Sequence, residues 1–155
     1  KQYYCNGQLK ESISFKDGIR HGPYISYYEN GQIELKANFE YGNYDGEWLT
    51  YYENGQIHYK ENYNLGEKNG KLIWYFPNGK IDLLMEFKDG ERAGEWIVYD
   101  STTSKIKSIE NYLNGNLHGE KITFHNNGQI HYKESYLNGE RIEMSEYNIT
   151  GKEIN

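Results

Sequence analysis

The sequence predicts an all-β fold: an elongated, single-layer antiparallel meander of repeated β-hairpins, twisted and curled, with almost no helix. Three observations predict it. A period of about 24 residues runs through the 155-residue chain, so that the segment Tyr28–Ile33 returns as Tyr52–Ile57. All 17 glycines fall into three columns of this period. Between the glycines, apolar and polar residues alternate, and no segment carries the 3.6-residue stripe of an amphipathic helix.

Two of the glycine columns predict turns. Asn-Gly opens most repeats, and Asp-Gly or Asn-Gly often marks the middle, as at Asp17-Gly18 and Asn114-Gly115. These dipeptides tolerate the positive φ of tight hairpin turns. The predicted turn glycines are Gly7, Gly18, Gly31, Gly42, Gly55, Gly66, Gly79, Gly90, Gly115, Gly128 and Gly139. Because the three columns use every glycine, none is left for a phosphate-binding loop.

Each repeat contains two predicted strands. Ile33, Leu35, Ala37 and Phe39 alternate with polar residues, and a second run covers Trp48–Tyr52. Twelve or so strands at about 4.8 Å spacing would form a sheet roughly 55–60 Å long. We expect one repeat domain over 1–155, with repeats at 3–26, 27–50, 51–74, 75–98, 99–123 and 124–146 and a partial, capping repeat at 147–155.

The repeat resembles the MORN repeat in the variant form found in many bacterial proteins. The segments that carry the resemblance are Phe15–Tyr24 and Tyr112–Glu120, together with the joining segment Tyr-Tyr-Glu-Asn-Gly-Gln-Ile. The resemblance implies a scaffold of β-hairpins without shared catalytic residues, and some bacterial relatives are antitoxin-like.

Composition and charge argue against several classes of protein. A net charge of -6 argues against a nucleic-acid binder, and it also disfavours anionic membrane surfaces. The sequence contains no run of about 20 apolar residues, so it predicts no membrane-spanning segment. Cys5 is the lone cysteine, so no internal disulfide can form. The compartment stays open: cytoplasmic, or exported if the start at Lys1 reflects a removed signal segment.

Residues with catalytic or metal-binding potential follow the repeat columns. His58 and His131 share one column and His21 and His118 another, which spreads them along the sheet. Glu61, Glu110 and Glu134 share a third, with adjacent members roughly 10 Å apart. We interpret both sets as structural, and His125 likewise. We therefore predict no enzyme, metal, cofactor or small-molecule substrate. We interpret the inserted turn Ser101–Ser104 as loop drift, and a functional hydroxyl-rich loop stays open as the alternative.

The aromatic residues predict two faces. If the register permits, the columns of Ile25, Tyr27, Ile33 and Phe39 would form one packed face. The opposite side of the second strand would then carry an exposed aromatic ribbon, because a single layer cannot bury both faces. We predict this ribbon to bind a partner; its residues are Tyr24, Tyr28, Trp48, Tyr52, Trp74, Phe76 and Trp96.

The leading functional hypothesis is a non-catalytic scaffold for protein–protein interaction. Tyr and Trp suit protein interfaces, and the same rings can also brace a thin sheet as cross-strand ladders. An antitoxin- or immunity-like component that binds a bacterial effector is the expected type. A membrane-associated scaffold and a spacer segment of a longer exported protein stay open as alternatives, and the oligomeric state is not predicted.

Overall fold

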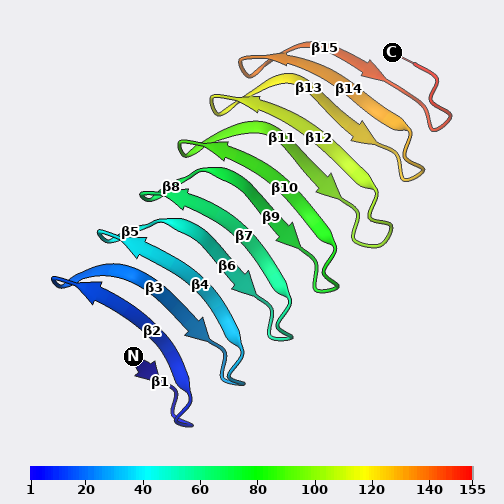
Figure 1. Ribbon diagram of the computed structural model, residues 1–155. Coiled ribbons are helices and arrows are strands. Elements are labelled where there is room, and N and C mark those ends of the chain that lie inside the picture. Colours follow the sequence, from blue (N-terminus) through cyan, green and yellow to red (C-terminus); the bar gives the residue numbers. More distant parts are fainter. Residues whose placement is uncertain (155) are drawn as a thin grey trace.

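The computed structural model describes residues 1–154, which form one antiparallel sheet of 15 strands and contain no helix. The strands pair in chain order, which confirms the predicted meander. Figure 1 shows the hairpins side by side, all bowed in the same direction, with the termini at opposite ends of the sheet. The strands are β1 (Gln2–Tyr3), β2 (Leu9–Lys16), β3 (Ile19–Tyr27), β4 (Ile33–Glu40), β5 (Asn43–Tyr44), β6 (Gly46–Tyr51), β7 (Ile57–Asn64), β8 (Glu67–Lys68), β9 (Gly70–Tyr75), β10 (Ile81–Lys88), β11 (Glu91–Tyr99), β12 (Ile106–Leu113), β13 (Asn116–Phe124), β14 (Ile130–Leu137) and β15 (Glu140–Glu146).

The turns along one edge of the sheet are two-residue type I′ turns. Asp17 and Gly18 have φ of 52° and 78°, and both positions of this turn type require positive φ. The same geometry recurs in the other five hairpins. These six turns lie along one end of the strands. We call this side of the sheet the type I′ edge.

Two of these turns carry residues that fit the geometry poorly. Tyr41 has φ of 46° and Leu65 has φ of 47°, where the other copies have Asp or Asn. Asp and Asn relieve this backbone region by local hydrogen bonding, whereas other residues lose roughly 1–2 kcal/mol there. The fold therefore tolerates Tyr41 and Leu65 at a cost.

The turns at the opposite edge are a different type. The Gly31 N–H donates to the Tyr28 carbonyl (2.9 Å), and the Tyr28 N–H donates to the Gln32 carbonyl (2.8 Å). Only Gly31 of the Asn30-Gly31 pair has positive φ (84°), while the Asn30 side chain accepts the Gln32 N–H (2.9 Å). This is a type I turn followed by a G1 bulge. Asn-Gly thus serves two turn types, one at each edge; we call this edge the bulge edge.

The register defines the two faces of the sheet. Tyr24 pairs with Ala37, while the adjacent Ile25 pairs with Lys36. Directly paired residues point to the same side. We call the side of Tyr24, Ala37 and Phe39 face A, and the side of Ile25 and Lys36 face B.

The predicted packed face is wrong in its composition. The register shifts between Ser26 and Tyr27, so that Ser26 pairs with Leu35 but Tyr27 pairs with Ile33. This bulge breaks the alternation of side chains along β4, so that Ile33 lies on face B. The column of Phe39 consequently lies on face A with Tyr24, Trp48 and Trp96, and not with Ile25.

The core is small and lies on face A. Among residues 1–154, the buried apolar side chains are Ala37, Phe39 and Leu72. The accessible surface is 9522 Å², whereas a compact protein of this mass exposes about 8,100 Å². A single layer therefore leaves more side-chain surface in contact with solvent than a two-layer domain does.

Candidate functional site

Aromatic rings and cations alternate along face A. Phe39, only 3% exposed, packs against Tyr44 (ring centroids 4.7 Å apart) and beneath the Arg20 guanidinium (5.4 Å). Farther along the sheet, the Arg92 guanidinium lies over both Trp96 (5.1 Å) and Tyr112 (5.3 Å). Arg20 on β3 and Arg92 on β11 each cover a ring of the next strand, and Arg92 also covers Trp96 of its own strand. This stacking joins successive repeats.

Three members of the predicted ribbon belong to this packing. Tyr24 lies 6.1 Å from Phe39, and Trp48 lies 4.5 Å from Tyr44 between ring centroids. Trp96 packs against Phe87 (5.5 Å) and donates its indole N–H to the Glu86 carbonyl (3.1 Å). Tyr24, Trp48 and Trp96 are half-buried and brace the sheet, with part of each ring left at the surface.

Face A also contains a buried carboxylate. Glu61 is 2% exposed and accepts hydrogen bonds from the hydroxyls of Tyr63 (2.6 Å) and Tyr59 (3.1 Å). The Lys68 ammonium lies 2.8 Å from its second oxygen. Burial and the Glu61 carboxylate hold the pKa of the Tyr59 and Tyr63 hydroxyls well above their usual value. Glu61 therefore joins three polar groups inside the sheet.

The same unit recurs in two later repeats. Glu110 accepts from the Tyr112 hydroxyl (2.7 Å) and pairs with Lys121 (3.0 Å). Glu134 accepts from the Tyr136 hydroxyl (3.2 Å), and Arg141 lies 2.9 Å away. Each carboxylate is held by a tyrosine and a cation, an arrangement that supports a structural interpretation of this column.

The Glu110 pair predicts a loss of stability in acid. Burial disfavours the charge of Glu110, but hydrogen bonds from Tyr112 and Lys121 outweigh it and hold the pKa of the carboxyl below its usual 4.5. The stabilising contribution is therefore present above pH 4.5 and disappears as the pH falls through the lowered pKa. We expect Glu110→Gln to lower the urea midpoint at pH 7, and the difference from wild type to shrink below about pH 4.5. A difference that grew on acidification would contradict this.

Three further ribbon residues lie at the bulge edge. The Tyr28 hydroxyl donates to the Tyr51 carbonyl (2.6 Å), and the Tyr52 hydroxyl donates to the Tyr75 carbonyl (2.7 Å). Tyr4 makes the equivalent bond, and His125 makes one from its ring Nε2. Phe76 occupies the same column but has no hydroxyl. Tyr28 and Tyr52 thus tie each repeat to the next one, and Phe76 interrupts the series.

This interruption predicts a stabilising substitution. Phe76→Tyr should restore the missing inter-repeat hydrogen bond and raise the free energy of unfolding by about 1 kcal/mol. Tyr52→Phe is the matched control and should lower it by a similar amount. Urea unfolding followed by tryptophan fluorescence measures both changes. An unchanged or lowered stability for Phe76→Tyr would contradict the structural role of this column.

Trp74 is the most solvent-exposed member of the predicted ribbon. Its side chain is 36% exposed and stacks on Tyr59 at 5.1 Å between ring centroids, with 14° between the planes. His58 packs edge-on against Trp74 (5.1 Å) and beside Tyr52 (4.4 Å). We call these four residues the Trp74 cluster. It presents a rigid aromatic surface formed by β7, β9 and the turn that precedes β7. The sequence prediction included Trp74 and Tyr52 but not His58 or Tyr59.

The histidines do not converge on a common centre. His125 and His131 stack at 4.1 Å, and the nearest carboxylate oxygen, on Glu146, lies 3.9 Å from His131. Within residues 1–154, no group of three or more His, Cys, Asp or Glu side chains is placed to hold a metal ion. The contacts of His125 and His131 therefore join neighbouring strands.

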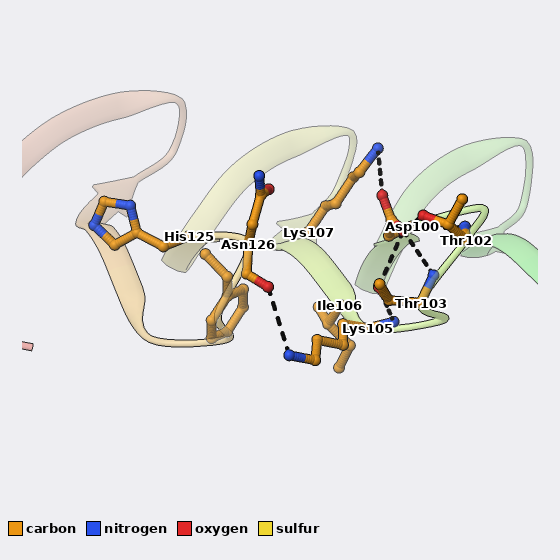
Figure 2. Close-up of a pocket in the computed structure, with 9 residues that line it drawn as sticks. Asp100, Thr102, Thr103, Lys105, Ile106, Lys107, His125 and Asn126 are labelled. Atoms are coloured by element: carbon orange, nitrogen blue, oxygen red, sulfur yellow. Dashed lines mark hydrogen bonds and ion pairs between the residues drawn. The ribbon is translucent and has the colours of Figure 1, made fainter. Parts of the chain in front are cut away.

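The inserted turn after β11 encloses a small pocket of about 200 Å³ (Figure 2). The Asp100 carboxylate accepts hydrogen bonds from the backbone and the hydroxyls of Thr102 and Thr103. These bonds hold the pKa of Asp100 well below its usual value. Lys107 lies 3.3 Å from Asp100, and Lys105 donates to the Asn126 carbonyl (3.5 Å). The polar groups of the turn thus satisfy one another.

Parts of the chain match two protein families. Residues 1–17, 20–41 and 117–138 match the MORN repeat variant, and residues 51–95 match a protein family of unknown function, DUF2963. Comparison with curated proteins gave no match. The matched segments lie in one continuous sheet of equivalent hairpins. The described part of the chain contains no helix of the length and apolarity that crossing a membrane requires.

Proposed function

We propose that this chain, parts of which match the MORN repeat variant, is a non-catalytic scaffold that binds another protein. The observation that carries the proposal is the Trp74 cluster, in which Trp74 stays 36% exposed although it is stacked on Tyr59. Rigid, half-exposed Trp and Tyr rings are the residues most enriched at the centres of protein interfaces. A partner that covered them would bury apolar surface that the single-layer sheet leaves open.

The charge of the chain favours a basic partner. The net charge is -6, and electrostatic complementarity of this kind accelerates encounter between proteins. A bacterial effector with a basic surface fits this requirement, and an antitoxin- or immunity-like role is the specific form of the proposal. The carboxylates of Glu61, Glu110 and Glu134, each occupied by a tyrosine and a cation, support the non-catalytic part of the proposal.

The test uses the immobilised chain as bait in extract of the source organism, followed by purification of each captured protein. Calorimetric titration of that purified protein should give specific binding that Trp74→Ala weakens about 30-fold, because removal of a central aromatic residue typically costs about 2 kcal/mol of binding energy. Val98→Ala is the matched control, because Val98 occupies the same repeat column but lies outside the cluster. Far-UV circular dichroism must be unchanged in both variants.

Equal affinities of wild type and Trp74→Ala would remove the cluster as the binding site, and a bait that binds no protein would refute the scaffold function. The antitoxin-like role has a separate readout. The captured protein should arrest growth when it is expressed alone, and co-expression of the chain should restore growth. A captured protein without toxicity would contradict that role.

A further inference from the structure

The type I′ edge carries two residues that cost the fold stability and gain no burial. Tyr41 and Leu65 hold positive φ, yet their side chains are 66% and 57% exposed. The equivalent turns contain Asp17, Asp89, Asn114 and Asn138, residue types that adopt this conformation readily. Tyr41 makes one edge-on contact, with the His21 ring (5.5 Å between centroids), and stays mostly exposed. Strained residues that gain so little packing point to a function.

The two residues lie in a row with a third apolar side chain. Ile19, in the preceding hairpin, is 50% exposed, and its Cγ2 lies 3.4 Å from the position that a Cβ on Gly42 would take, next to Tyr41. The turns of the three hairpins follow one another along the same edge (Figure 1). Neighbouring hairpins are two strand spacings apart, roughly 10 Å. We call Ile19, Tyr41 and Leu65 the turn-edge row.

The opposite edge lacks this character over the same hairpins. Its turns present Glu29-Asn30 and Glu53-Asn54, which are exposed and polar. The two edges of the sheet therefore differ chemically, although both consist of tight turns. In these hairpins, the turns with exposed apolar side chains are those of the type I′ edge, where Asp or Asn would make the fold more stable.

The surroundings of Tyr41 and Leu65 are acidic, whereas Lys16 and Arg20 flank Ile19. Glu40 precedes Tyr41, Glu67 follows the Leu65 turn, and Asp45 accepts the Leu65 N–H (3.2 Å). Within residues 1–154, none of these three carboxylates forms an ion pair, whereas the nearby Lys68 is paired with Glu61. A protein with basic residues around an apolar groove complements this rim, and an anionic membrane does not.

The size of the row argues against contact between two copies of the chain. A stable interface needs about 800 Å² per partner. Three side chains supply less, since even an aromatic residue buries at most roughly 150–250 Å². A groove that encloses the row can also contact the flanking strands and reach the required area.

We propose that the turn-edge row docks into an apolar groove with a basic rim on the protein partner, with Tyr41 and Leu65 as its anchors. This inference rests on the proposed scaffold function and adds a second contact surface to it. It requires that Tyr41 and Leu65 strengthen binding of the partner while they lower the stability of the fold.

Tyr41→Asn with Leu65→Asn tests this requirement, because the two expected effects have opposite signs. The double variant should melt a few degrees higher than wild type, since Asn relieves the turn strain. It should also bind the purified partner captured by the chain at least 10-fold more weakly. Leu137→Asn is the matched control: Leu137 is exposed on the same edge but lies outside the row, so affinity should not change.

Photo-crosslinking locates the contact independently. Benzoylphenylalanine at position 41 or 65 should crosslink to the purified partner, whereas the same probe at 126 or 127, exposed on the bulge edge away from the Trp74 cluster, should not. Unchanged affinity of the double variant, or equal crosslinking from both edges, would overturn the inference while Trp74→Ala still reports on the scaffold function. Binding of the row to phosphatidylcholine or phosphatidylglycerol vesicles, or a dimer that the double variant dissociates, would also overturn it. If the chain captures no protein, both proposals fail.

Discussion

Replacement of Phe39 by alanine should lower the free energy of unfolding by about 3–5 kcal/mol, the largest effect that we expect from a single apolar substitution. Phe39 is 3% exposed and is enclosed by Tyr24, Tyr44 and the Arg20 guanidinium. Its removal would leave a cavity that the thin sheet has few side chains to fill. Urea unfolding monitored by circular dichroism measures the change.

Phe15 provides the matched control. It occupies the same column of the preceding repeat but is 60% exposed. Phe15→Ala should therefore cost less than about 1 kcal/mol, because little surface returns to water. Similar losses for both substitutions would show that the column stabilises the sheet independently of burial, contrary to the packing on face A.

Replacement of Glu61 by alanine should cost about 3 kcal/mol. The carboxylate is the acceptor for the hydroxyls of Tyr59 and Tyr63 and the ion-pair partner of Lys68. Without it, two half-buried hydroxyls lose their acceptor in a region with little access to water, and an unpaired buried donor is costly. The measurement is again the urea-unfolding free energy at pH 7.

Two further variants separate the effect of the lost hydrogen bonds from the effect of the lost side-chain volume at Glu61. Glu134→Ala removes the equivalent carboxylate, whose side chain is 12% exposed and whose partner Arg141 reaches solvent, and it should cost less than Glu61→Ala. Tyr63→Phe should cost about 1 kcal/mol alone but almost nothing in the Glu61→Ala background. Additive losses in the double variant would contradict a shared hydrogen-bond network.

The period and the turns could be predicted from the sequence because they depend on local chemistry. Asn-Gly and Asp-Gly specify tight turns within a few residues, and alternation specifies a half-buried strand. The meander follows from these features, since short turns leave no other neighbour for each strand. The structure adds that Asn30 and Asn114 act differently, one through its side chain and the other through positive φ.

The composition of the faces could not be predicted because it depends on the bulges. One extra residue on β4, opposite the step from Ser26 to Tyr27, exchanges the faces of the β4 residues that follow it. Alternation in the sequence continues through Ile33 and Leu35 without a sign of this shift. Trp48 and Trp96 were therefore placed on an exposed ribbon, whereas they lie beside the rings of the Phe39 column.

The proposed binding surface can be predicted only in part from the sequence. The strand pattern predicts that Trp74 belongs to the exposed ribbon. Its stacking on Tyr59 depends on the pairing of β7 with β9, which the sequence does not reveal. Tyr41 and Leu65 carried a signal that alignment of the repeat columns can detect, because both stand where four other copies have Asp or Asn. Their exposure became evident only from the turn geometry.

The register decides which aromatic side chains hold the repeats together and which remain available to a partner. Aromatic nuclear Overhauser effects of the labelled protein test it directly. Contacts between the Trp48 indole and the rings of Tyr44 and Tyr63 are predicted, since the centroids lie 4.5 Å and 6.1 Å apart on face A. Contacts of Tyr63 with Leu49 and Tyr51, and none with Trp48, would place the two columns on opposite faces and contradict the register.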